Sequence, residues 1–287
     1  MPPISETNLI LNSDGSIYHL SLLPRQVSET IITVGDPSRV YRISEHFDSL
    51  DFEMNKREFI THIGKYKGKR VTVMSTGIGT DNIELFMTEL DALVNVDLTT
   101  REPRSRKKKL SIIRIGTSGA IQENVPVGSF VVTDYAIGLD NLMDYYNLVM
   151  DEFEEEIAED LRNTVSLPHT PYIVKGSSAL KKQFAHDMIS GNTITTPGFF
   201  APQGRKVRLP IRYPNMLDDL RKYYNKPNDF RVSNFEMETA GYYAMCRLLG
   251  HEAISLNAII ANRPKNKFAK DPNKVIDGLI EKVLDRI

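Results

Sequence analysis

The sequence has a single cysteine, Cys246, among its 287 residues. One cysteine excludes an intrachain disulfide and a cluster of thiolate metal ligands, and it favours a reducing compartment. We therefore expect a cytoplasmic protein that holds no metal. Its N-terminus has no positively charged segment followed by an apolar one, and no apolar run approaches the roughly 18 residues of a membrane span. The sequence thus predicts a chain with neither a leader nor a membrane anchor.

No excess of charge of either sign is present. Lys and Arg number 36 against 37 Asp and Glu, and the pI is about 6.6. The chain therefore lacks the broad basic field that nucleic-acid binding requires. One basic run, Arg101–Lys109 (REPRSRKKK), stands out, but in a neutral chain such a run is typically a solvated loop. We expect a small-molecule partner and no nucleic acid.

Apolar runs alternate with amphipathic ones, and no strong linker divides them. With 41% hydrophobic residues, the chain is long enough for one large α/β domain. The pattern predicts a mostly parallel sheet covered by helices on both faces. Strands are predicted at 30–35, 56–63, 69–75, 112–115, 130–133, 172–178 and 253–262, the last interpreted as wholly apolar.

Ile112–Ile121 (IIRIGTSGAI) is the stretch around which a site is expected to form. Apolar residues flank Arg114, and the run then breaks into small residues, which predicts a buried strand that ends in a tight turn. In open α/β sheets, ligands bind at the carboxyl ends of such strands. Glycine amides, the hydroxyls of Thr117 and Ser118 and the charge of Arg114 suit a phosphate. The alternative is a plain turn beside an edge-strand arginine.

Thr30–Val40 (TIITVGDPSRV) predicts a second anion-binding element. Here an apolar strand ends at Gly35, and Asp36-Pro37-Ser38 begins a helix. The amide of Gly35 and the side chain of Arg39 can then face one anion at the N-terminus of the helix. A capped turn with a surface arginine is the alternative.

Two later stretches carry further candidates. Thr195–Leu209 is predicted to be a loop in which Gln203 and Arg205 reach one planar ring, with a polar surface loop as the alternative. Ser233–Gly250 is predicted to be a helix whose capping box is formed by Ser233 and Glu236. That assignment leaves Glu238 without a structural partner, and its carboxylate can accept two hydroxyls of a sugar.

Two acidic segments are interpreted as purely structural. Asp81 and Glu84 resemble a capping box at the start of a helix after Gly79. Asp151–Asp160 (DEFEEEIAED) is expected to be an exposed helix start, because nothing in it suggests a buried carboxylate.

Four stretches, in the family's order, resemble the nucleoside phosphorylase family that includes the uridine phosphorylases. They are VGDPSRV at Val34–Val40, REF at Arg57–Phe59, RIGTSGAIQ at Arg114–Gln122 and FEMET at Phe235–Thr239. Weaker matches lie at Tyr18–Leu20, Ser75–Gly79, Gln203–Arg205 and Ala261–Arg263. The resemblance implies one domain over residues 1–287 with a three-layer αβα fold around a central mixed, mostly parallel sheet. In this fold residues 1–29 form an N-terminal extension that packs at a subunit interface.

The resemblance also implies a role for each matching residue. For phosphate these are Gly35, Arg39, Arg114 and Thr117, joined by Arg57 of a neighbouring subunit. For ribose they are Met237, Glu238 and a neighbour's His19, and for the base Phe199, Gln203, Arg205 and Arg263. Arg114, Glu238 and Arg205 would be the catalytic residues.

The activity implied is that of a uridine phosphorylase, which converts uridine and phosphate reversibly to uracil and ribose 1-phosphate. The enzyme would be a homo-oligomer, a dimer or a hexamer of dimers, with shared active sites and without a cofactor, since phosphate is a co-substrate. Purine-specific relatives have an aspartate where Asn262 stands, which argues against purines. A purine phosphorylase, a nucleosidase and a non-catalytic nucleoside-binding or storage protein are the alternatives. Arg101–Lys109 looks like an insertion, and Leu142–Leu161 has no recognised counterpart.

Overall fold

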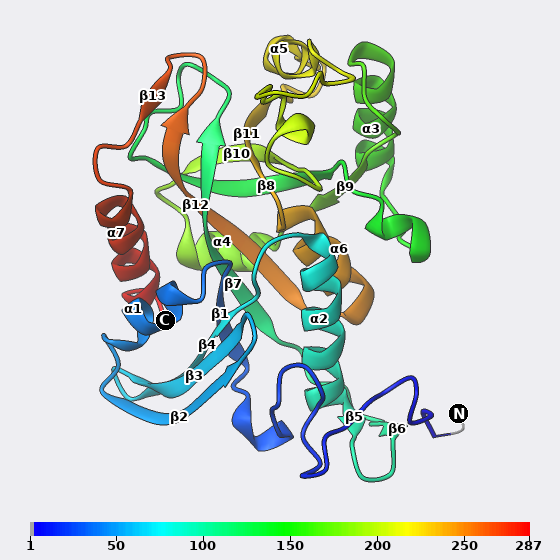
Figure 1. Ribbon diagram of the computed structural model, residues 1–287, viewed down its shortest axis with the longest axis vertical. Coiled ribbons are helices and arrows are strands. Elements are labelled where there is room, and N and C mark those ends of the chain that lie inside the picture. The colour runs from blue at the N-terminus through cyan, green and yellow to red at the C-terminus, as the bar shows by residue number, and fades with distance from the viewer. Residues whose placement is uncertain (1–2) are drawn as a thin grey trace.

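Eleven strands form the central sheet of the computed structural model, which describes residues 3–287 (Figure 1). The strands of this sheet are β1 (Thr30–Val34), β2 (Ser49–Lys56), β3 (Phe59–Tyr66), β4 (Lys69–Ser75), β7 (Ser111–Ala120), β8 (Phe130–Gly138), β9 (Tyr172–Lys175), β10 (Ile189–Thr195), β11 (Val232–Glu236), β12 (Glu252–Asn262) and β13 (Lys267–Phe268). A separate hairpin pairs β5 (Val96–Asp97) with β6 (Glu102–Pro103).

The helices lie between these strands along the chain. They are α1 (Ser38–Ser44), α2 (Thr80–Asn95), α3 (Glu152–Thr164), α4 (Ser178–Phe184), α5 (Met216–Lys222), α6 (Thr239–Leu249) and α7 (Pro272–Leu284). Short 3₁₀ turns are η1 (Pro24–Gln26), η2 (Leu142–Tyr145) and η3 (Ala201–Gln203). The expected α/β alternation is therefore present.

Five strands of the sheet close into a ring. β7 pairs with β12, β12 with β8, β8 with β10 and β10 with β11, and β11 returns to β7. On the other side of β7 the sheet continues through β1, β4, β3 and β2. Its parallel pairings lie at the centre, whereas the antiparallel ones lie at the edges and where the ring closes. The expected central mixed sheet is confirmed.

Helices cover both faces of this sheet. α2 and α6 pack together on one face, and α1, α4 and α7 lie on the other (Figure 1). Side chains of β7 point alternately to the two faces of the sheet. Ile112 packs in the apolar cluster with α2 and α6, and Ile113 and Ile115 pack in the cluster with α1, α4 and α7. Burial on both faces explains why the strand reads as a continuous apolar run. The three-layer expectation is confirmed.

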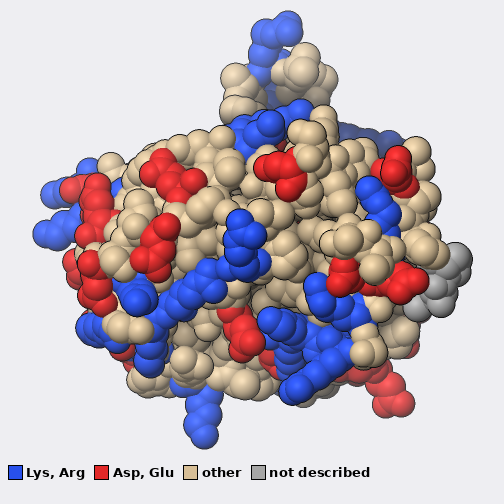
Figure 2. All heavy atoms as spheres, turned by 90° about the horizontal axis from the view of Figure 1, so that it is seen from below, with Lys and Arg blue, Asp and Glu red and all other residues tan. Residues whose placement is uncertain are grey.

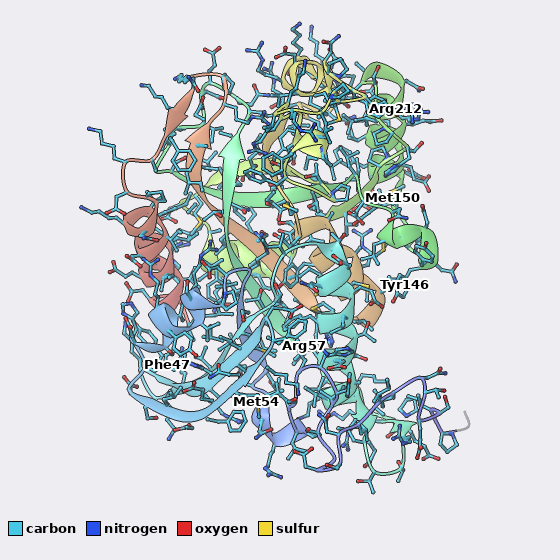
Figure 3. All side chains as sticks on the ribbon, viewed as in Figure 1. Phe47, Met54, Arg57, Tyr146, Met150 and Arg212 are labelled. Carbon is cyan, nitrogen blue, oxygen red and sulfur yellow. The ribbon has the colours of Figure 1, made fainter. Side chains whose placement is uncertain are left out.

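One predicted helix start and one predicted helix cap are wrong. Ser233 lies in β11, where its hydroxyl donates to the carbonyl of Asn192, and α6 begins only at Thr239. The start of α2 follows Gly79, without a side-chain cap. Glu84, which was expected to complete that cap, instead accepts a hydrogen bond from Tyr146, the residue that follows η2 (Figure 3). In both places the sequence has the spacing of a helix cap, but the side chains make tertiary hydrogen bonds and do not cap the helix.

The acidic segment contains a buried carboxylate, contrary to expectation. Asp151 and Glu154 form the capping box of α3, and Glu154 is fully buried. Its two oxygens accept bonds of 2.6 Å each from the guanidinium of Arg247 on α6, and one also accepts the amide of Lys175. The ion pair thereby joins α3, α6 and β9.

The N-terminal segment packs against its own subunit. Ile17, Leu20 and Leu22 are fully buried beside α2. The basic run helps to hold this segment, because the carbonyl of Arg101 accepts the amide of Ile4 at 2.8 Å. Packing of residues 1–29 at a subunit interface remains a prediction.

Charges of both signs are interspersed on the face shown in Figure 2. Within the basic run, Lys109 pairs with Glu252 and Arg104 lies 3.7 Å from Asp97. Across residues 3–287 no helix is long and apolar enough to cross a membrane.

Replacing Glu154 tests the buried ion pair. Glu154→Ala should lower the free energy of unfolding by about 3–5 kcal/mol, because it leaves Arg247 and two backbone amides without their acceptor. The measurement is urea denaturation at neutral pH. Glu155→Ala, on the exposed side of the same helix turn, is the control and should stay within about 0.5 kcal/mol of wild type. Equal losses in the two variants would show that the ion pair does not stabilise the fold.

Candidate active site

A cavity of about 800 Å³ opens at the carboxyl ends of β1, β7 and β11. Nine of the residues predicted from the sequence line it: Gly35, Arg39, Arg114, Thr117, Phe199, Gln203, Arg205, Met237 and Glu238. Three others, His19, Arg57 and Arg263, are not part of its wall. The structure thus brings together segments that are up to about two hundred residues apart along the chain.

Arg114 is the centre of the cavity floor. It is 4% exposed, and its Nη2 lies 2.5 Å from Glu238 and 3.0 Å from Glu236. Burial by itself lowers the pKa of this guanidinium, but the two carboxylates outweigh burial and raise the pKa above its usual value. Arg114 is therefore a fixed cation whose position both carboxylates determine.

Room for the Arg114 side chain depends on Gly116. Both residues point to the same side of β7, and a Cβ at position 116 would lie 2.0 Å from Nη1 of Arg114. The predicted tight turn at residues 116–119 is wrong, because these residues continue β7 and pair with β12. Gly116 is needed because the guanidinium folds back over it.

Glu238 faces Arg114 from the residue that precedes α6. One of its oxygens accepts the amide of Gly79 at 2.9 Å, and the other accepts Arg114. Burial raises the pKa of Glu238, the nearby charge of Glu236 adds to this rise, and Arg114 opposes it. The carboxylate retains lone pairs with which it can accept hydroxyl groups.

Glu236 has a larger role than the expected capping box. One carboxylate oxygen accepts the amides of Glu238 and Thr239 at 2.9 Å each, which caps α6. The same oxygen contacts Arg114, and the other accepts the hydroxyl of Thr195. Glu236 was missed as a site residue because its spacing from Ser233 matched a helix cap.

A second arginine lies close to Arg114. Burial lowers the pKa of Arg39, the charge of Arg114 lowers it further, and Asp36 opposes both. Gly35 precedes this segment, and a Cβ there would approach the carbonyl of Gly77 to 3.2 Å. A buried guanidinium, Arg114, and a half-buried one, Arg39, would both be stabilised by an anion between them.

The loop at Thr195–Leu209 forms the opposite wall. Gln203 is 2% exposed, its amide nitrogen donates to the hydroxyl of Thr196 at 3.0 Å, and its amide oxygen accepts Arg205. The guanidinium of Arg205 stacks 3.7 Å above the ring of Phe199. Burial, together with the charge of Arg263, lowers the pKa of Arg205 to about 10, so Arg205 is a cation at neutral pH. An amide, a guanidinium and an aromatic ring side by side suit a planar, polar ring.

Arg263 supports this loop from behind, because its guanidinium donates to the carbonyl of Gln203. Asn262 does not face the cavity. Its amide donates to the carbonyls of Gln122 and Val125 at 2.9 and 2.8 Å, which ties the end of β12 to a loop. In this conformation the side chain of Asn262 therefore cannot select the base.

His19 and Arg57 lie outside the cavity of their own subunit. A buried carboxylate on α2, Glu89, accepts the Nδ1 of His19 at 2.7 Å and also the amides of His19 and Leu20. Arg57 is exposed at the turn between β2 and β3, with a positive φ of 53° (Figure 3). The action of both residues on a neighbouring subunit stays a prediction.

Several wall residues had no role predicted from the sequence. These are Glu58, Ile78, Asn82, Phe235 and Phe268; Glu236 had been predicted only as part of a helix cap, and Ser118 only as a hydroxyl in a turn. Ile78 lies within the STGIG match and Asn82 follows it, so this match was a usable signal, whereas Phe268 reaches the wall through the short β13 and no sequence signal pointed to it. Within residues 3–287, no group of three or more His, Cys, Asp or Glu side chains is arranged to hold a metal ion.

Comparison with known proteins gives consistent matches over almost the whole chain. The family model described as "Phosphorylase superfamily" matches residues 29–282. A uridine phosphorylase from Thermococcus kodakarensis is 31% identical over 264 residues, which are 91% of this chain and 83% of that protein. A DeoD-type purine nucleoside phosphorylase from Brevibacillus brevis is 26% identical over 270 residues, 93% of this chain and 97% of that one.

Among solved structures, the chain is similar to a Trypanosoma brucei nucleoside phosphorylase that shows uridine phosphorylase activity. The TM-score is 0.88 at 29% identity, and the match covers 97% of this chain and 100% of the other.

Substituting Gly116 tests the geometry of the floor. Gly116→Ala should displace Arg114 and lower the free energy of unfolding by about 3–5 kcal/mol, because two buried carboxylates lose their cation. Gly119→Ala, on the same strand, is the control: its Cβ would meet nothing closer than 3.9 Å, and its stability should stay within about 0.5 kcal/mol of wild type. Thermal and urea denaturation measure both. Wild-type stability of Gly116→Ala would mean that Arg114 tolerates a different position.

Proposed function

The chain belongs to the phosphorylase superfamily, on the uridine phosphorylase branch of the nucleoside phosphorylases, and is a pentosyltransferase; we propose that its reaction is the reversible phosphorolysis of uridine. One observation carries the proposal. Buried Arg114, half-buried Arg39 and the buried carboxylate of Glu238 lie on one side of a single cavity. The stacked Phe199–Arg205 pair with Gln203 lies on the other. This arrangement supports an anionic nucleophile on one side of a sugar and a polar base on the other.

The phosphate would bind at the amide of Gly35 and the side chains of Arg39, Arg114 and Thr117. Its charge satisfies the two neighbouring guanidinium groups, and their fixed positions hold one phosphate oxygen ready to attack C1′ of the ribose. Inorganic phosphate is a co-substrate, and we propose that no cofactor takes part.

The ribose would lie between the phosphate and α6. Glu238 would accept its hydroxyls, and Met237 would contact its carbon face. Breaking the bond between C1′ and the base builds positive charge on the sugar, which the phosphate anion and the Glu238 carboxylate stabilise. Arg114 keeps that carboxylate in place throughout.

The base would bind at the loop wall beside Phe199. Uracil leaves with negative charge spread over a ring nitrogen and two carbonyl oxygens, so donors are needed and a strong acid is not. Arg205 would donate to a uracil carbonyl, and the oxygen of Gln203 would accept the N–H of the ring in place of its bond to Arg205. Arg263 would hold the loop.

We propose further that the active enzyme is a homo-oligomer with shared sites. Arg57 would complete the phosphate site of a neighbour, and His19 would reach the neighbour's ribose. The exposure of Arg57 and the separation of both side chains from their own cavity support this proposal. The cytoplasmic location is a proposal that the single cysteine supports.

Turnover assays with and without phosphate test the proposed reaction. Uridine should release uracil only when phosphate is present, and inosine should react at least about tenfold more slowly, because a purine leaves Gln203 and Arg205 imperfectly paired. Liquid chromatography of the free bases measures both. Release without phosphate would identify a nucleosidase, preference for inosine a purine phosphorylase, and no turnover of any nucleoside a binding protein.

Mixing two inactive variants tests the shared site. Arg57→Ala and Arg39→Ala each remove one phosphate contact, and in a mixed dimer one site carries both lesions while the other carries neither. If half of the dimers are mixed, activity should return to about a quarter of wild type. Subunit exchange is verified by native mass spectrometry. Confirmed exchange without recovery would place Arg57 in its own subunit's site or outside any site.

A further inference from the structure

The interior of the five-stranded ring is polar. Each strand turns buried polar side chains inward, and these side chains are at most 5% exposed: Arg114 and Ser118 on β7, Ser255 and Asn257 on β12, Thr133 on β8, Thr193 on β10 and Asn234 on β11. β12 is therefore not the wholly apolar strand that was expected. Its alternation of Ser255 and Asn257 with apolar residues is the pattern of a strand with one polar face.

Six of these side chains, all except Ser255, form one continuous chain of hydrogen bonds. It begins at Nη1 of Arg114, which contacts Oδ1 of Asn257 at 3.1 Å. It ends at Oγ of Ser118, which accepts the amide nitrogen of Asn234 at 2.9 Å. Both ends, Arg114 and Ser118, line the cavity. The chain thus leaves the cavity at one residue of β7 and returns to it four residues later.

Arg114 sets the direction of the first half of this chain. A guanidinium only donates, so the Asn257 group that faces it must be the amide oxygen. The amide nitrogen of Asn257 then points to the hydroxyl of Thr133, 3.3 Å away. Because that hydroxyl accepts, its hydrogen is free for Thr193, whose Oγ1 lies at 2.6 Å.

The second half follows from the first. Thr193 accepts from Thr133 and donates its own hydrogen to Oδ1 of Asn234 at 3.1 Å. The amide oxygen of Asn234 thus faces the hydroxyl of Thr193, and the hydroxyl of Ser233 lies 2.5 Å from the same oxygen, so the nitrogen of Asn234 faces Ser118. Ser118 receives this bond, and within residues 3–287 its own O–H has no protein acceptor.

We propose that Asn257, Thr133, Thr193 and Asn234 form a directed hydrogen-bond relay that makes Ser118 a donor into the cavity, toward an acceptor oxygen of the nucleoside. The four residues are positioning residues, which act through Arg114 at one end and Ser118 at the other. This inference rests on the proposed phosphorolysis of uridine. It adds that a chain of buried hydrogen bonds determines the direction in which the hydroxyl of Ser118 donates.

The placement of Ser118 favours the nucleoside over the phosphate as its partner. β7 lies between β1, which leads to Gly35 and Arg39, and β11, which leads to Met237 and Glu238. Ser118 is bonded to Asn234 on β11, and therefore lies on the side of the proposed ribose and base contacts. Loss of its hydrogen bond should accordingly affect the nucleoside more than the phosphate.

Asn234→Asp reverses the relay at its last step with almost no change of shape. An ionised carboxylate accepts the hydrogen of Ser118, which then no longer points into the cavity, whereas the neutral acid can donate as the amide does. At high pH the variant should lose about tenfold in kcat/KM for uridine, with the KM for phosphate within twofold of wild type. As the pH falls, this loss should shrink toward zero. Ser118→Ala should show the same loss at every pH.

The double variant separates the relay from a simple effect of a buried charge. If Asn234 acts through the Ser118 hydroxyl, Ser118→Ala/Asn234→Asp should be no worse than Ser118→Ala and should have no additional pH dependence. If the pH dependence persists without the hydroxyl, the charge acts on folding and the relay is refuted. Asn192→Asp is the matched control, because its amide donates to the carbonyl of Arg231 away from the relay. It should keep wild-type kinetics.

Thr193→Val provides a second variant in case the aspartate does not fold. It keeps the shape, removes the link between Thr133 and Asn234, and should lower kcat/KM for uridine without changing the KM for phosphate. Wild-type kinetics in a folded Thr193→Val protein would overturn the relay. Uridine turnover by the wild-type protein is measured first. If the wild type does not cleave uridine, the proposed function is wrong; if it does and the variants behave like the wild type, only the relay is wrong.

Discussion

The interaction on which the site depends is the burial of one guanidinium inside a closed ring of strands. A charge removed from water is tolerated only when its donors are satisfied and its charge is compensated. Arg114 therefore requires Glu236 and Glu238 at the end of β11, Ser255 and Asn257 on β12, and no side chain at position 116. Three strands are fixed relative to one another by this single group. The position of Glu238, and hence the start of α6, follows from the same requirement.

Much of this could be predicted from the sequence because the relevant signals are local. The stretches around Gly35 and Gly116 combine apolar strand residues with small residues and an arginine, a composition typical of the carboxyl ends of parallel strands. Only the stretch at Gly35 forms the predicted turn, because residues 116–119 continue β7 and pair with β12. Glu238 stood out because it had no structural partner. The loop residues Gln203 and Arg205 were recognised by their chemistry, and the structure places both in the same wall.

The remaining features depend on contacts between distant segments, which periodicity does not contain. Ser233 and Glu236 have the spacing of a helix cap, yet they lie in a strand, because pairing of β11 with β10 and β7 outweighs local preference. Glu154 is one of several acidic residues in a row, and only the approach of Arg247 from another helix buries it. The polar interior of the ring could not be predicted from the sequence for a similar reason. Each of the five strands contributes only one or two of the polar side chains, so no single strand shows the pattern.

Helix α2 connects two parts of the molecule that were described separately. Near its start the amide of Gly79 holds Glu238, and ten residues later Glu89 holds the ring and backbone of His19. At 1.5 Å of rise per residue these contacts are about 15 Å apart on one rigid rod. If His19 contacts a neighbour's ribose as proposed, α2 holds Glu238 of its own site and also His19, which acts in the neighbouring subunit's site. Any displacement of α2 would then move a contact of each of the two sites together.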